Sequence, residues 1–134
     1  MDEILINLAH VDFLKVLWIF PVVVTFHELE EWNIIRWYQQ NFVNLPQLTN
    51  KGIRAWIVFS SILGFLWTGI AVLTNDPNIA ALVLVVAFAL MLQNGFQHIY
   101  YFFYFRRYAP GMITSILLLF PTIGYITTRA DQQG

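Results

Sequence analysis

Long apolar segments constrain this chain more than any other feature of its sequence. They run at about residues 11–35, 53–74, 79–105 and 111–128, and together cover most of the 134 residues. A helix of about 20 apolar residues spans the roughly 30 Å hydrocarbon core of a bilayer, because each residue adds about 1.5 Å. Charged residues make up only 11% of the chain, whereas soluble domains carry roughly a quarter. We therefore predict an all-α integral membrane protein, a four-helix bundle forming a single four-span domain over residues 1–134.

The first apolar segment is the least regular of the four. Its uncharged core runs only from Val16 to Phe26, and the acidic stretch 27–31 follows directly. A re-entrant segment is therefore the alternative to a full crossing. Pro21 lies inside this segment and Pro121 inside the fourth, and a proline removes one backbone hydrogen bond of a helix. We expect kinked helices at both positions.

The basic residues indicate an orientation in the membrane. With four crossings, the first and third connections lie on one side, and they hold most of the basic residues: Arg36, Lys51, Arg54, Arg106 and Arg107. The other side holds Lys15 and Arg129. Connections rich in basic residues usually lie on the cytoplasmic side of a membrane. We therefore predict a multi-pass protein of the plasma (inner) membrane, with the 1–2 and 3–4 connections in the cytoplasm and both termini extracytoplasmic.

Charge and cysteine content exclude some classes of function. A formal net charge of −1 gives no indication of nucleic-acid binding. Because the chain has no cysteine, it has no disulfides, thiolate metal sites or cysteine nucleophiles. Chemistry would then depend on histidines, carboxylates and hydroxyl groups.

Ionisable residues occur at helical spacing in two of the segments. Glu30 and Glu31 follow His27 by three and four residues, so the three share one helix face. Asn94 and His98, four residues apart in the third segment, also share a face. Each segment therefore presents one polar face near its end.

These polar faces are predicted to lie at the same depth. His27 follows Val11 by 16 residues and Asn94 follows Asn78 by 16 residues, so each lies roughly 24 Å from the outer side. The two segments run in the same direction, and the stretch 108–111 begins the fourth segment on the same side. We therefore expect three polar stretches to converge near the cytoplasmic interface.

A group of buried charges needs a neutralising partner, since each costs at least ~2.5 kcal/mol in hydrocarbon. The partner could be a metal ion, a shared proton or a nearby arginine. Nitrogen and oxygen ligands suit a divalent transition metal such as zinc, iron or manganese. The predicted ligands are the ionisable groups at this depth: His27, Glu30, Glu31 and His98. Glu30 is alternatively a general base, and Asn94 and Tyr101 would orient a ligand or a bound water.

Structural interpretations stay open beside this one. His27 and its neighbouring glutamates could lie solvated among the headgroups without a function, and His98 could be a packing histidine. Asn94 could only join helices by hydrogen bonds.

The three polar stretches resemble a known set of motifs. His27–Glu31 reads H-x-x-E-E, Asn94–His98 reads N-x-x-x-H and Tyr108–Gly111 reads Y-x-P-G. In this order they resemble the HXXEE-motif family of small membrane proteins, over nearly the whole chain. That family has no settled function and has been suggested to consist of integral membrane enzymes. The resemblance implies these family positions: His27, Glu30, Glu31, His98, Tyr108, Pro110 and Gly111. Tyr108 then joins Glu30 as a candidate catalytic residue.

Three functions are compatible with these features. The first is a metal-dependent membrane enzyme, in the simplest case a hydrolase that acts on a membrane lipid or another apolar small molecule. The second is a small proton-coupled transporter in which Glu30 or Glu31 alternates between proton and cation, although the polar groups reach only one face. The third is a non-catalytic membrane subunit. Assembly as a homo-oligomer is left open.

Overall fold

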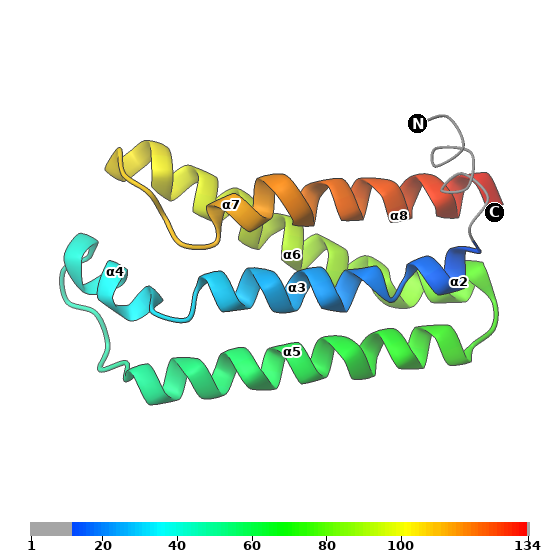
Figure 1. The fold of residues 1–134 in the computed structure, drawn as a ribbon, viewed down its shortest axis with the longest axis horizontal. Helices are drawn as coiled ribbons and strands as arrows, with labels where there is room; N and C mark the ends of the chain where they lie inside the picture. The colour runs from blue at the N-terminus through cyan, green and yellow to red at the C-terminus, as the bar shows by residue number, and fades with distance from the viewer. Residues whose placement is uncertain (1–11, 134) are drawn as a thin grey trace.

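The computed structural model describes residues 12–133 and is all-helical in that part of the chain (Figure 1). The elements follow one another along the chain as α2 (Phe13–Val16), α3 (Ile19–Glu30), α4 (Ile34–Asn41), α5 (Asn50–Leu73), α6 (Pro77–Phe105), α7 (Met112–Thr114), the π-helix η1 (Ser115–Leu119) and α8 (Phe120–Gln133). The predicted start of the first segment, at Val11, lies outside the described residues.

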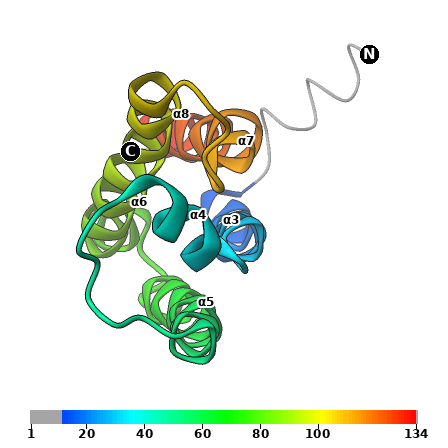
Figure 2. The same ribbon diagram turned by 90° about the vertical axis from the view of Figure 1, so that its left-hand side faces the viewer.

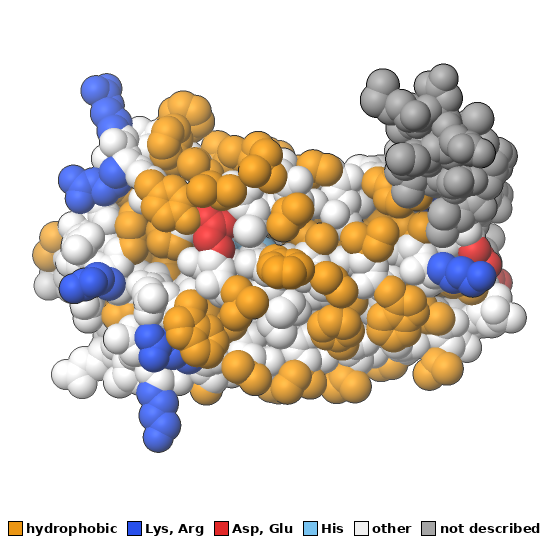
Figure 3. All heavy atoms as spheres, viewed as in Figure 1, with side chains coloured by type: hydrophobic (Ala, Val, Ile, Leu, Met, Phe, Trp, Pro, Cys, Tyr) orange, Lys and Arg blue, Asp and Glu red, His pale blue; other side chains and the backbone are white. Residues whose placement is uncertain are grey.

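Within the described residues, three helical stretches are long and apolar enough to cross a membrane: Asn50–Leu73, Asn78–Phe105 and Met112–Gln132. Most of their exposed side chains are apolar, as Leu82 on α6 illustrates with 71% of its surface exposed. Figure 3 shows hydrophobic side chains along the length of one face of the molecule. An apolar surface of this extent agrees with helices that could cross a membrane.

The first apolar segment is divided into two helices. α2 ends at Val16 and α3 begins at Ile19, so neither piece alone has the length of a membrane span. At the division, the Leu17 carbonyl accepts a hydrogen bond from the backbone N–H of Phe20 (3.1 Å). Pro21, the next residue, has no N–H to donate. The irregular backbone therefore lies just before the proline.

The fourth segment also departs from a regular α-helix before its proline. The backbone N–H of Phe120 donates to the carbonyl of Ser115, five residues earlier, as in a π-helix. Pro121 follows directly. The wider turn places Thr114 and Ser115 toward α3, which contacts both α7 and η1.

The helices α3, α5, α6 and α8 lie side by side along the long axis of the molecule (Figures 1 and 2). α3 packs against α5 on one side and against η1 and α8 on the other, while α6 contacts α5, η1 and α8. Leu17, Leu84, Leu119 and Ile126 are fully buried in the core that these helices share. The packing fixes the relative positions of α3, α6 and η1, which carry the polar residues discussed below.

The connection between the first two apolar segments contains the helix α4. The indole N–H of Trp37 on α4 donates to the backbone carbonyl of Tyr108 (2.6 Å). Its ring also packs against Tyr101 and Phe105, near the end of α6. α4 is thereby joined to the connection between α6 and α7.

Candidate functional site

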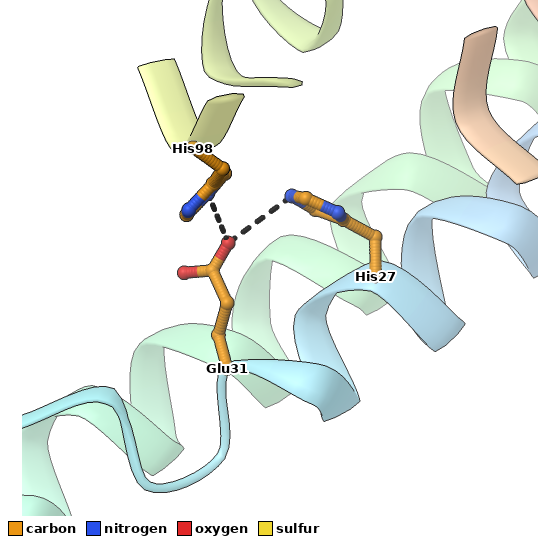
Figure 4. Close-up of side chains that lie close together, drawn as sticks. All are labelled: His27, Glu31 and His98. Carbon is orange, nitrogen blue, oxygen red and sulfur yellow. Dashed lines mark ion pairs between the residues drawn. The ribbon is translucent and has the colours of Figure 1, made fainter. Parts of the chain in front are cut away.

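Three of the predicted metal ligands meet at the end of α3. The Nε2 atom of His27 lies 3.1 Å from Oε1 of Glu31, and the Nε2 atom of His98 lies 2.8 Å from the same oxygen (Figure 4). One ligand atom from each residue lies within 4.8 Å of the others. We call these three residues the His–Glu cluster.

The cluster is enclosed by protein. The side chains of His27 and His98 are 0% and 4% exposed, and that of Glu31 is 14% exposed. His27 lies on α3, Glu31 is the residue after its end, and His98 lies on α6. Glu31 is therefore the member of the cluster that a small molecule reaches most easily.

Asn94 joins the cluster from α6. Its Oδ1 lies 2.6 Å from Nε2 of His27. This contact agrees with the depth expected from the sequence, in which His27 and Asn94 reach the same level. The two oxygens nearest to His27 Nε2 therefore belong to Glu31 and Asn94.

The other ring nitrogen of His27 faces two hydroxyl groups. Its Nδ1 lies 3.0 Å from Thr114 Oγ1 and 3.4 Å from Ser115 Oγ. The Thr114 hydroxyl donates to Glu30 Oε2 (2.5 Å), and the Ser115 hydroxyl donates to the Gly111 carbonyl (2.6 Å). Because both hydroxyl protons are engaged elsewhere, both oxygens are free to accept from Nδ1–H, and in a neutral ring this favours the proton on Nδ1.

This tautomer directs a lone pair of His27 Nε2 at the oxygens of Glu31 and Asn94. Among the described residues, buried side-chain atoms without hydrogen-bond geometry include Glu31 Oε1 and both ring nitrogens of His98. Two ligands about 2.1 Å from one ion, at 90–110° to each other, lie about 3.0–3.4 Å apart. The contacts of Glu31 Oε1 with the two imidazoles, at 3.1 and 2.8 Å, lie close to this range, so these three described residues could hold a divalent metal ion.

Glu30 faces a different set of partners. Its carboxylate accepts hydrogen bonds from the Tyr108 hydroxyl, from the backbone N–H of Ile113 (3.3 Å) and from that of Thr114 (2.8 Å). These N–H groups lie in the first turn of a helix, where they have no acceptor within the helix and carry the positive end of its dipole. The structure therefore places Glu30 beside the His–Glu cluster and joins it to His27 through Thr114.

Tyr108 belongs to the same hydrogen-bonded pair. Burial, together with the hydrogen bond to Glu30 and the charge of that carboxylate, raises the pKa of its phenol. A neutral phenol donates a stable hydrogen bond to Glu30. The two predicted catalytic residues thus contact each other, and neither is one of the three residues of the cluster.

Tyr101, predicted to orient a ligand or a bound water together with Asn94, lies in an aromatic cluster. Its hydroxyl accepts a hydrogen bond from Gln97 Nε2 (2.6 Å), and its ring packs against Trp37 and Phe42. The described contacts of Tyr101 therefore join α6 to α4.

The sequence alone does not indicate Thr114 and Ser115 as site residues. They follow Gly111 by three and four residues, so they occupy the first turn of the helix that begins after it. The available signal is a pair of hydroxyl residues one helical turn after the Y-x-P-G stretch. Their importance depends on the contact with His27, which is distant in the sequence.

The comparisons with known proteins give one match. No curated protein and no solved structure matches the chain. Residues 18–126 match the family described as proteins of unknown function with the HXXEE motif. The matched stretch contains all three residues of the His–Glu cluster, together with Asn94, Tyr108 and Thr114. Because the match extends over most of the sequence, this chain belongs to the HXXEE-motif family of unknown function.

Proposed function

We propose that the chain is a membrane-embedded, metal-dependent hydrolase of a lipid or another apolar substrate. His27, Glu31 and His98 would bind one divalent zinc, iron or manganese ion. The observation that carries the proposal is the meeting of two imidazole Nε2 atoms on one carboxylate oxygen in a buried position.

The hydrogen bonds of His27 support the choice of a metal. With the Nδ1 proton donated to Thr114, the Nε2 lone pair would face oxygen atoms and would need a positive partner. Histidines that bind metals donate their other N–H to an oxygen acceptor in this way. Asn94 Oδ1 supplies a fourth donor atom next to these three ligand atoms.

The residues around the cluster have distinct roles in this proposal. A bound divalent ion would supply Lewis acidity and lower the pKa of a water molecule toward neutrality. Both contacts to the histidines involve Oε1 of Glu31 (Figure 4), so we assign Oε2 to accept a proton from water. Glu30 accepts hydrogen bonds from Tyr108, Ile113 and Thr114, and we therefore assign it to holding Thr114 against His27.

The membrane setting supports an apolar substrate. The stretch from Phe13 to Glu30 would extend about 27 Å at about 1.5 Å per residue, close to the roughly 30 Å hydrocarbon core. We therefore propose that α2 and α3 together form a fourth crossing. The basic connections would face the cytoplasm, and the His–Glu cluster would lie near that surface, where a lipid can reach it from the bilayer.

The test of the hydrolase proposal is a product search. Purified protein in lipid nanodiscs would be loaded with zinc, iron(II) or manganese, incubated with a total lipid extract and analysed by mass spectrometry. We expect products that correspond to the addition of one water to a lipid, and no such products with Glu31→Gln. The substitution Asp131→Asn, which removes an exposed carboxylate near the end of α8, is the control. Identical lipid profiles for the wild type and Glu31→Gln would contradict the hydrolase proposal.

A structural role for the cluster is the second candidate. The same contacts, with His27 and His98 protonated in place of a metal, would join α3 to α6 as an imidazolium–carboxylate group. In that case the metal-free protein would be as stable as the metal-loaded protein. A melting temperature that rises with added metal distinguishes the hydrolase proposal from this one.

A further inference from the structure

Gly111 lies directly against the imidazole of His98. A Cβ atom built on Gly111 would lie 2.8 Å from Nε2 of His98 and 2.9 Å from both Cδ2 and Cε1. Real Cβ atoms essentially never approach a neighbour so closely. The backbone of Gly111 therefore lies against the Nε2 edge of the ring and leaves no room there for a side chain. The Nε2 atom on this edge also lies 2.8 Å from Glu31 Oε1.

The turn that carries Gly111 is held in place at several points. The Tyr108 carbonyl accepts the hydrogen bond from Trp37, and the Tyr108 hydroxyl donates to Glu30. The Gly111 carbonyl accepts from both the backbone N–H (3.1 Å) and the hydroxyl (2.6 Å) of Ser115. Gly111 is thus fixed relative to α4, α3 and η1.

The same residue is connected to the second imidazole. Ser115, whose hydroxyl donates to the Gly111 carbonyl, has its oxygen 3.4 Å from Nδ1 of His27. Gly111 therefore touches one histidine of the cluster and is linked to the other through a single side chain.

Other glycines of the spanning helices do not share this relation. Cβ atoms at Gly64 and Gly69 would make ordinary contacts at 3.8 Å and 3.7 Å, and one at Gly124 would meet no atom within 4 Å. Gly95 is as crowded as Gly111, but its nearest atoms belong to Phe120. Among these glycines, Gly111 alone lies against a predicted metal ligand.

We infer that Gly111 is the positioning residue of His98: its missing side chain lets the imidazole reach Glu31, and its backbone keeps the ring there. The inference rests on the proposed function, because the Nε2 atom of His98 must be correctly placed to bind the proposed metal. The positive φ of Gly111 (93°) adds a second reason for glycine, and a test must separate backbone strain from the contact with the ring.

A double-mutant cycle separates these two causes. The melting temperature of metal-free protein would be measured for the wild type, Gly111→Ala, His98→Ala and the double variant. If the added methyl acts on the ring, the loss caused by Gly111→Ala is smaller once His98 is alanine. Folding of the double variant alone, where Gly111→Ala does not fold, supports the inference as well. Equal losses in both backgrounds, including failure of both to fold, would overturn it.

Titration with cobalt(II), followed by visible absorption, measures metal affinity, which a change in packing away from the ligands does not alter. We expect Gly111→Ala to weaken cobalt binding by about 10- to 100-fold, the range known for residues that orient metal ligands, and Gly124→Ala to leave it unchanged. Unchanged affinity in Gly111→Ala would also overturn the inference. A wild type that binds no cobalt would contradict the proposed metal site, while the double-mutant cycle would still decide whether Gly111 positions the ring.

Discussion

The imidazole rings of His27 and His98 lie edge to face, with centroids 5.3 Å apart and an interplanar angle of 71°. Both rings direct Nε2 at one oxygen of Glu31. Two nitrogens from different helices thus approach a single carboxylate oxygen in a buried place. This relation between α3 and α6 is the basis of the predictions that follow.

Glu31→Gln should remove metal binding while the helices stay folded. Glutamine has nearly the same shape, but it lacks the negative charge that stabilises a cation between two imidazoles. We expect the affinity to fall by at least the ~10- to 100-fold seen when outer residues of metal sites are lost. Isothermal titration with zinc would measure it, and circular dichroism would report helix content. Asp131→Asn, at an exposed position of α8, is the control, and equal affinities for the two variants would argue against Glu31 as a ligand.

Thr114→Val should destabilise the protein, because it removes the hydroxyl that joins Glu30 to His27. The buried His27 Nδ1 would then keep only its longer contact with Ser115 Oγ (3.4 Å), and a buried group that loses its partner costs about 1–3 kcal/mol. Reversible unfolding in mixed detergent micelles would measure the loss. Thr114→Ser, which keeps the hydroxyl, should restore most of the stability. Thr127→Val removes a hydroxyl that only bonds within its own helix and should have a much smaller effect, so a loss as large as that of Thr114→Val would count against the proposed link.

Gly95→Ala should destabilise the contact between α6 and the fourth segment. The added Cβ would lie 2.6 Å from Cε1 of Phe120 and 3.2 Å from Ser115 Oγ. Overpacking of this kind costs about 1–3 kcal/mol. Gly124→Ala meets no atom within 4 Å and is the matched control. If both variants unfold at the same denaturant concentration as the wild type, the result would contradict the close contact between Gly95 and Phe120.

Single cysteines should reveal the number of crossings, because the natural chain has none. With four crossings, cysteines that replace Asp12 and Asn75 lie on one side of the membrane, and those that replace Gln47 and Arg107 lie on the other. A membrane-impermeant maleimide applied to intact cells would label only the first pair if the basic side faces the cytoplasm. Labelling of Asp12→Cys together with Gln47→Cys would instead indicate a re-entrant first segment.

The membrane class and most helix boundaries could be predicted from the sequence, since both follow from local apolar runs. The third segment was expected at 79–105, and α6 spans Pro77–Phe105. The break at Leu17 was anticipated only as a kink near Pro21. The sequence does not indicate that Trp37 packs against the end of α6, because that contact joins residues far apart in the chain.

The candidate site was predictable only as far as helical spacing determines direction. Glu30 and Glu31 were placed on one face with His27, but α3 ends at Glu30 and Glu31 leaves helical geometry (φ −85°, ψ 4°). Glu30 then accepts the free N–H groups of the helix that begins after Gly111. The partners of Glu30 are determined by packing between distant parts of the chain, and the spacing of residues along one helix cannot predict them.

The metal content of the purified protein tests the central claim most directly. Elemental analysis by mass spectrometry would compare the wild type with His98→Ala and with Gln97→Ala, a control on the neighbouring exposed position of α6. We predict about one zinc, iron or manganese per chain in the wild type and in Gln97→Ala, and loss of that metal in His98→Ala. Wild-type protein that carries no metal after purification or metal loading, with the same result for His98→Ala, would contradict the account.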